Sequence, residues 1–246
     1  MGYDNLGDRM KGYEGRNQYY LQRRTPVIIR IDGKAFHTFT KGFARPFDEV
    51  LGNAMVLTME YLCKNIQGCV FGYTQSDEIT LVLIDYMRLD SDAWFDYRTD
   101  KMCSIAASMA TMAFNRYFYE LMPADADNTD IYYKALEKGA MFDARVFNIP
   151  KEEVCNCIYW RQLDATRNSI QMVGQANFSH NELQGKSCNM IQNMLLMQRG
   201  INWHNYETRW KRGVAWTRHG GIDWDMPVLI GEGREYVETV IYPEVE

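Results

Sequence analysis

Residues 72–83 read GYTQSDEITLVL, and the apolar run CVFGY at 69–73 leads into them. Two apolar runs separated by a short polar segment predict a β-hairpin. Asp77 and Glu78 place two adjacent negative charges where the two strands meet. Such a pair is either a solvated turn or a site for a cation, and the neighbouring sequence distinguishes between them.

The segments on either side of this hairpin complete a regular order. Residues 26–32 form a short apolar strand, and a helix with Asp48 as its N-cap opens near Pro46 and ends near Gly68. A second long helix is expected over residues 92–121 and a fourth strand over 141–149. The order βαββαβ predicts an α+β, ferredoxin-like domain, which is a four-stranded antiparallel sheet with two helices on one face.

The pattern of the sequence changes after Pro150, so we divide the chain into a first domain, 1–149, and a C-terminal region, 150–246. The C-terminal region is expected to be mainly helical, with helices over about 151–178 and 182–200 and a terminal hairpin. No linker rich in Pro, Gly or Ser separates the two parts. This predicts that the C-terminal region packs on the first domain.

Composition narrows the class of protein. The 246 residues are 46% hydrophobic, and their net charge of −5 does not point to a nucleic-acid partner unless a local basic face exists. The polar N-terminus is unlike a secretory signal, and no apolar run approaches the ~18 residues of a membrane helix. The six cysteines show no C-x-x-C spacing. We therefore expect reduced thiols, a cytoplasmic location and no membrane partner.

Asp32 closes the first strand, and the ferredoxin-like order brings the end of that strand beside the hairpin that carries Asp77. Two neighbouring carboxylates repel one another, and a divalent cation relieves the repulsion. Magnesium takes oxygen ligands, commonly one or two carboxylates together with substrate phosphates. Gly33 has no Cβ, so its backbone carbonyl can approach a metal closely. The pattern therefore predicts the two-magnesium site of a polymerase palm, with Asp32, Gly33 and Asp77 as metal ligands.

A triphosphate at this site needs partners of its own. The backbone of residues 32–37 can present successive N–H groups to phosphate, and basic side chains follow at Arg45, Arg98 and Lys101. Taken singly, Asp-Gly is a common turn dipeptide and each basic residue is equally well an ordinary surface charge. The joint placement of the two acids favours the metal and nucleotide site.

Several motifs together resemble the tRNA-histidine guanylyltransferase family, and most closely its bacterial and archaeal-type members, the reverse polymerases. The motifs are RIDGKAFHTF, FARPFD, GYTQSDE, a helix with WF, Arg and Lys, FDARVF and WRQLDATRNS, and the match covers roughly residues 1–220. The resemblance implies an enzyme that adds nucleotides to the 5′ end of tRNA in the 3′-to-5′ direction. The 5′ end is activated with ATP or already bears a triphosphate, the 3′-hydroxyl of the incoming nucleotide attacks it, and pyrophosphate leaves.

The resemblance also implies roles for single residues. It makes Asp32, Asp77 and Glu78 the catalytic residues, with Asp32, the Gly33 carbonyl and Asp77 holding two Mg2+ ions. The binding of GTP, ATP and other nucleoside triphosphates is assigned to Asp32, Gly33, Lys34, Ala35, Phe36, His37, Arg45, Ser76, Asp77, Arg98 and Lys101. The implied partners are tRNA and nucleoside triphosphates, and the implied assembly is a homotetramer.

One stretch departs from the family pattern. Members that mark histidine tRNA carry His-Ile-Asn-Asn after W-R-Q-x-D-x, whereas Thr166-Arg-Asn-Ser169 stands here and retains only Asn168. We therefore expect template-dependent repair of 5′-truncated tRNA. The alternatives are a tRNA-histidine guanylyltransferase proper, a palm-type nucleotide cyclase and a non-catalytic RNA-binding protein.

Overall fold

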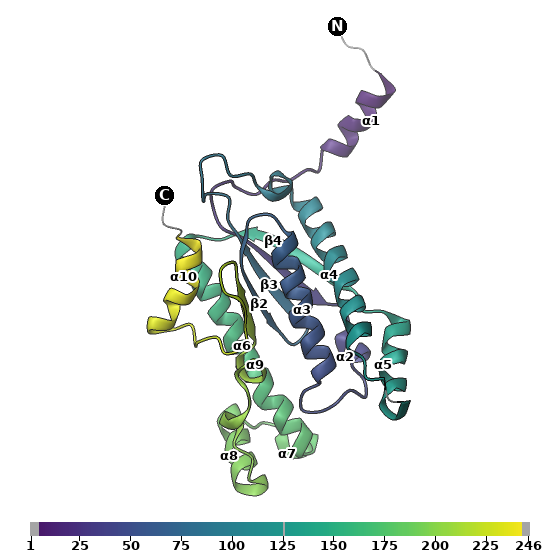
Figure 1. Ribbon diagram of the computed structural model, residues 1–246, viewed down its shortest axis with the longest axis vertical. Helices are drawn as coiled ribbons and strands as arrows, with labels where there is room; N and C mark the ends of the chain where they lie inside the picture. The colour runs from purple at the N-terminus through teal and green to yellow at the C-terminus, as the bar shows by residue number, and fades with distance from the viewer. Residues whose placement is uncertain (1–4, 125, 243–246) are drawn as a thin grey trace.

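A computed structural model describes residues 5–124 and 126–242, which form one antiparallel sheet with helices on both faces (Figure 1). The strands are β1 (Val27–Gly33), β2 (Cys69–Gln75), β3 (Glu78–Leu83), β4 (Phe142–Asn148), β5 (Val214–Thr217) and β6 (Gly221–Asp223). The α-helices are α1 (Leu6–Gly15), α2 (Phe36–Phe39), α3 (Glu49–Asn65), α4 (Thr99–Leu121), α5 (Ala126–Lys138), α6 (Lys151–Asn177), α7 (His180–Leu183), α8 (Cys188–Arg199), α9 (Thr208–Arg212) and α10 (Glu235–Ile241). Short 3-10 turns occupy Trp94–Tyr97, Trp203–Asn205 and Gly231–Arg234. No helix in these residues is both long enough and apolar enough to cross a membrane.

The predicted ferredoxin-like arrangement is confirmed. The sheet has the strand order β4-β1-β3-β2-β5-β6, and its first four strands are those expected from the βαββαβ sequence. Helices α3 and α4 cover one face, as predicted, and Asp48 caps α3 by accepting a hydrogen bond from the Leu51 N–H at 2.9 Å. Ile29 and Ile31 of β1 point into this core, because alternate residues of a strand share a face.

The opposite face of the sheet is covered as well. Ile28 of β1 and Val82 of β3 pack there against Val154 and Ile158 of α6, and α10 contributes Ile241 to the same core. The two faces therefore bury separate cores on one sheet. Helix α6 continues past the sheet and packs with α8 in a third, smaller core.

The C-terminal region does not end in a hairpin within the described residues. Its hairpin is β5–β6, which joins the sheet beside β2, and the later residues form the helix α10. The join is tight because the Tyr73 hydroxyl donates to the Arg212 carbonyl at 2.7 Å. A Cβ at Gly213, whose φ is +88°, would lie 2.6 Å from the Thr74 carbonyl oxygen, so only glycine fits this approach. The boundary at residue 150 stays a prediction.

The two ends of the sheet are distinct and far apart. Gly33, the last residue of β1, donates its N–H to the Asp77 carbonyl at 3.0 Å, so the β2–β3 turn lies at that end. Val27, the first residue of β1, is paired with Leu83, from which the chain leads to the start of α4. At about 3.3 Å per residue the seven residues of β1 separate these ends by about 20 Å.

Candidate active site

The acidic residues named from the sequence gather at the end of the sheet where β1 stops and the hairpin turns. Asp32 is the register partner of Glu78, so their side chains leave the same face of the sheet. Asp77 precedes Glu78 in the turn, and its carbonyl accepts the Gly33 N–H at 3.0 Å. Backbone pairing thus brings together acids that lie 45 residues apart in the sequence.

Asp77 sits in a two-residue turn that costs energy to form. Ser76 has a φ of +51°, a left-handed conformation that residues with a Cβ rarely adopt. The Ser76 hydroxyl donates to the Asp77 carboxylate at 3.2 Å. Burial raises the pKa of Asp77, and the negative charge of Asp32 raises it further, while the Ser76 hydrogen bond lowers it. A carboxylate with a raised pKa beside another carboxylate is an arrangement that a bound cation would stabilise.

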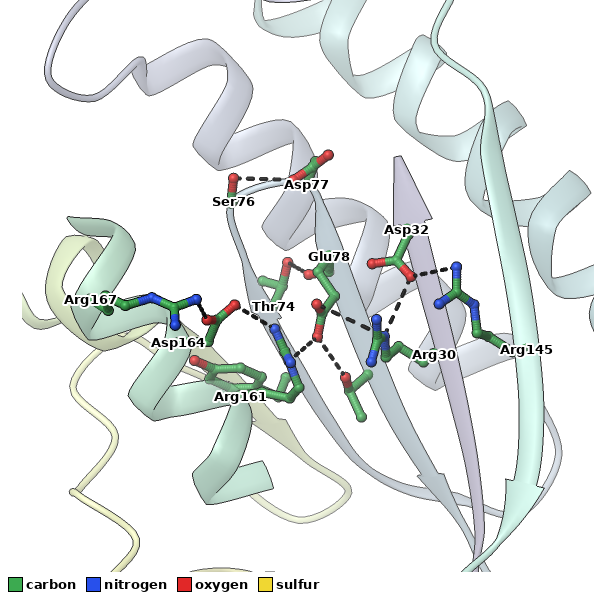
Figure 2. A network of polar contacts seen from close by, with 12 residues as sticks. Arg30, Asp32, Thr74, Ser76, Asp77, Glu78, Arg145, Arg161, Asp164 and Arg167 are labelled. Atoms are coloured by element: carbon green, nitrogen blue, oxygen red, sulfur yellow. Dashed lines mark hydrogen bonds and ion pairs between the residues drawn. The ribbon is translucent and has the colours of Figure 1, made fainter. Parts of the chain in front are cut away.

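Asp32 lies between two arginines of the same sheet face. The Arg30 Nε atom is 3.4 Å and the Arg145 Nη2 atom 3.3 Å from its Oδ2 atom (Figure 2). Arg30 and Arg145 are register partners on β1 and β4, so the strands themselves bring the two cations together. Neither arginine was named from the sequence, although the alternation of VIIRID places Arg30 on the Asp32 side of the strand.

Glu78 is held differently from the two aspartates. Its side chain is buried, and its Oε1 atom forms an ion pair with the Arg161 Nε atom of α6 at 2.7 Å. Burial raises the pKa of Glu78 more than the charges of Arg161 and Arg30 lower it. Arg161 in turn contacts Asp164 at 2.7 Å, and Asp164 also pairs with Arg167 (Figure 2). The W-R-Q motif therefore supplies the counter-ion of the hairpin acid, which the sequence reasoning did not foresee.

A cavity of about 490 Å3 opens beside Asp77. Of the residues expected to bind a nucleotide, its lining contains Gly33, Ala35, Phe36, His37, Arg45, Ser76 and Asp77. Asp32 and Glu78 are not part of the lining, and Lys34 is exposed, with its N–H bonded to the Met141 carbonyl at 2.8 Å. The structure thus gathers seven of the predicted residues around one space of the right size for a ligand.

Gly33 and Phe36 have structural reasons for their identity. A Cβ on Gly33 would lie 2.3 Å from the Phe36 ring, so glycine is required before this turn. Phe36 is buried in the α3–α4 core, where its ring centroid lies 5.1 Å from that of Phe142 and 5.2 Å from that of Phe39. Phe36 therefore anchors the loop that follows β1 and forms the floor of the cavity.

Arg98 and Lys101 do not join this site within one chain. The Arg98 residue forms a β-bridge with Tyr20, and Lys101 lies over the Phe95 ring at 5.7 Å. Both belong to the start of α4, at the end of the sheet where β1 begins (Figure 1). That end is about 20 Å from Asp32 by the length of β1.

The donor set suits a hard cation that is shared with a substrate. Among the described residues no group of three or more His, Cys, Asp or Glu side chains is assembled for a metal. Asp32, Asp77 and the Gly33 carbonyl offer oxygen ligands, and magnesium commonly completes its shell with water and substrate phosphates. Two carboxylates and one carbonyl at one end of the sheet, with Asp77 and Gly33 also lining the cavity, fit that mode of binding.

Comparisons with known proteins are consistent with this geometry. The family model described as tRNAHis guanylyltransferase matches residues 7–150. The tRNA(His) guanylyltransferase of Saccharomyces cerevisiae is 27% identical over 214 residues, which are 80% of this chain and 84% of that protein.

Two solved structures are also similar. A bacterial tRNA(His) guanylyltransferase-like protein in complex with ATP superposes with a TM-score of 0.88 at 40% identity, over 97% of this chain and 100% of that chain. A bacterial guanylyltransferase-like protein in complex with GTP has a TM-score of 0.79 at 37% identity and the same coverage. The expected α+β fold is thus matched over nearly the whole chain.

The buried ion pair gives a prediction for stability. Arg161→Ala would leave Glu78 buried without its nearest counter-ion, and such a loss typically lowers the free energy of unfolding by about 3–5 kcal/mol. Arg167→Ala removes an arginine that is 60% exposed and is the matched control, with an expected loss below about 1 kcal/mol. Urea unfolding of both variants measures the difference. Equal losses in the two variants would contradict the account of Glu78.

Proposed function

The chain belongs to the tRNA(His) guanylyltransferase family and is a tRNA guanylyltransferase-like nucleotidyltransferase; on this premise we propose that it adds nucleotides to the 5′ end of tRNA in the 3′-to-5′ direction, with two Mg2+ ions. Its physiological task in this proposal is template-dependent repair of 5′-truncated tRNA. The 5′ end is activated with ATP or already carries a triphosphate.

The position of Asp77 is the main support for this proposal. Asp77 lies both beside Asp32 and in the lining of the 490 Å3 cavity, so the same residue would touch the proposed metal site and the proposed nucleotide site. Phosphoryl transfer needs this proximity, because the reacting phosphate must be close to the charge that stabilises it. The bacterial relatives bound to ATP and GTP support nucleoside triphosphates as the occupants of the cavity.

Each residue of the site has a separate role in the proposed reaction. Asp32, Asp77 and the Gly33 carbonyl would hold the metal ions, which would supply Lewis-acid activation of the attacking 3′-hydroxyl and charge stabilisation at the leaving oxygen. Arg45 and the backbone of residues 35–37, which line the cavity, would orient the triphosphate. Arg161 holds the Glu78 carboxylate in place by an ion pair at 2.7 Å, and its charge opposes the effect of burial on the pKa of Glu78. The 3′-hydroxyl loses its proton and its oxygen bonds to the 5′ phosphorus of the RNA. The bond that breaks releases pyrophosphate from a 5′-triphosphate, or AMP from a 5′-monophosphate that ATP has first adenylylated with release of pyrophosphate.

The preference for repair rests on the stretch Thr166–Ser169. Thr166 and Arg167 line an open groove of about 740 Å3 between α6 and α8. Ser169 is buried, where its hydroxyl accepts a hydrogen bond from the Trp203 indole N–H at 3.0 Å. A buried Ser169 and a paired Arg167 leave this stretch without the side chains that the histidine-marking members carry. Base pairing with the opposing strand then selects the incoming nucleotide.

Labelled tRNAs test the proposal. We expect 5′-truncated tRNAs of several identities to be extended, each with the nucleotide complementary to its template, in reactions with magnesium and single nucleotides. Asp32→Asn and Asp77→Asn should each abolish extension and keep the circular dichroism spectrum of the folded protein, because they remove metal ligands at the edge of the core. The measurement is kcat/KM for truncated and intact tRNAs with matched and swapped anticodons.

The alternatives give different results in the same assay. A strong preference for the histidine anticodon with little repair of other tRNAs would establish the guanylyltransferase proper instead. Turnover of a nucleoside triphosphate in the absence of RNA, with no extension, would establish a cyclase. RNA binding without any nucleotide transfer would establish a non-catalytic RNA-binding protein.

We also propose that Arg98 and Lys101 contact a triphosphate held by a neighbouring chain of a homotetramer. Their distance from the acids of their own chain is the reason, since a basic pair about 20 Å away cannot reach the same phosphates. A neighbouring chain can supply them across an interface.

Mixed assemblies test this sharing. Asp77→Asn is expected to abolish extension and Arg98→Ala to reduce it strongly, but co-expressed chains carrying one change each should recover part of the activity. The recovery follows because an assembly of both chains contains sites with an intact Asp77 from one chain and an intact Arg98 from the other. Affinity tags of two kinds verify that the mixed assemblies form. Mixed assemblies without recovery, or a fully active Arg98→Ala variant, would contradict the shared site.

A further inference from the structure

A large exposed aromatic ring lies next to the acids and has no role in the site described above. Trp160 of α6 is 54% exposed, whereas its neighbours Ile158 and Arg161 on the same helix are buried. The guanidinium carbon of Arg30 lies 5.7 Å from the centroid of the Trp160 ring, and Arg30 also contacts Asp32 at 3.4 Å. The Arg30 side chain therefore lies between the exposed indole and the Asp32 carboxylate, which is a metal ligand in the proposed function.

A second arginine contacts the same indole. The guanidinium carbon of Arg161 lies 4.2 Å from the centroid of the Trp160 ring, and Arg161 is itself fixed by ion pairs to Glu78 and Asp164, each at 2.7 Å. Cation–π contacts of this kind orient the ring and limit its motion. A rigid aromatic surface loses little conformational entropy when a flat ligand stacks on it.

The surroundings of Trp160 suit the end of a nucleic acid. Arg145 and Phe147 on β4 are exposed on the face of the sheet that carries Arg30, and Leu163 is exposed one turn further along α6. Arg30 and Arg145 both form ion pairs with Asp32. A metal cation bound to Asp32 would replace these ion pairs, and both guanidinium groups could then bind phosphate. Basic groups interleaved with aromatic rings are the pattern that binds single-stranded or terminal nucleotides, and stacking tolerates any base.

We propose that Trp160 is a stacking platform for the terminal nucleobase of the RNA whose 5′ end is extended. The proposal rests on the proposed function and names the part of the RNA that this face recognises. Within a base-paired helix only the terminal pair exposes the flat side of a base, so stacking of that pair on Trp160 would place the terminal 5′ phosphate near Asp32. The platform would thereby select helix ends over helix interiors without reading sequence.

Equilibrium binding separates this role from general attraction to phosphate. The probes are an RNA hairpin with one open, 5′-phosphorylated end and the same helix closed at both ends into a dumbbell. We expect the wild-type protein to bind the open form more tightly. Trp160→Ala should weaken binding of the open form roughly tenfold and leave the dumbbell unchanged, because only the open form loses a stacked base. Trp160→Phe should keep most of the affinity.

Two controls complete the experiment. Tyr119→Ala removes an exposed aromatic residue from α4, on the other face of the sheet, and should change neither affinity. ATP binding without RNA should be the same in wild type and Trp160→Ala. Equal loss for open and closed helices, an unchanged affinity in Trp160→Ala, or a Phe variant as weak as the Ala variant would each overturn the platform. A wild-type protein that extends tRNA but does not prefer open ends would overturn it too, while leaving the proposed function in place.

Discussion

The site depends on one constraint, which is that the backbone holds the negatively charged side chains of Asp32 and Asp77 at the same end of the sheet. The backbone hydrogen bond from Gly33 to the Asp77 carbonyl joins the end of β1 to the β2–β3 turn, and it brings the Asp32 and Asp77 carboxylates to the same end of the sheet. Burial and mutual repulsion make this arrangement costly for the folded protein. A left-handed Ser76 adds to the cost. Strain of this kind persists where the surrounding structure over-determines it, and it is typical of functional sites.

The arginines around the acids explain how the fold tolerates that charge. Arg30 and Arg145 flank Asp32 within the sheet. Arg161 of α6, the helix that packs on this face of the sheet, offsets the negative charge of Glu78. The charges alternate along one path from α6 across the sheet to β4 (Figure 2). Asp77 alone among the three acids has no arginine or lysine partner within 4 Å in the described part of the chain, which leaves its carboxylate available for a cation.

Much of this arrangement could be predicted from the sequence. The alternation of apolar residues and the turn at Gln75–Glu78 gave the strand order, and the strand order placed Asp32 beside the hairpin. Asp48 was recognisable as a helix cap because its position before an apolar, helix-periodic run is typical of one. The local pattern of apolar residues and the short connections between neighbouring elements were sufficient to predict these features.

Other features depend on long-range packing and could not be predicted in the same way. Arg161 lies on a helix, where a charged residue usually faces solvent, and only the contact of α6 with the sheet shows that it is buried. The pairing of β5 with β2 joins residues about 140 apart in the sequence. The sequence predicts Arg98 and Lys101 at the acids, but Arg98 is the N-cap residue of α4 and Lys101 lies in its first turn, at the other end of the sheet.

The central claim is that Asp32 and Asp77 form a divalent-cation site that is continuous with the nucleotide cavity. Crystals of the wild-type protein grown with Mn2+ and a non-hydrolysable ATP analogue test it directly through anomalous scattering. We expect manganese peaks in contact with the oxygens of Asp32 and Asp77, with the phosphates of the analogue beside Arg45 and Ser76. A nucleotide bound in the cavity with manganese elsewhere, or with no manganese peak at these two carboxylates, would contradict it.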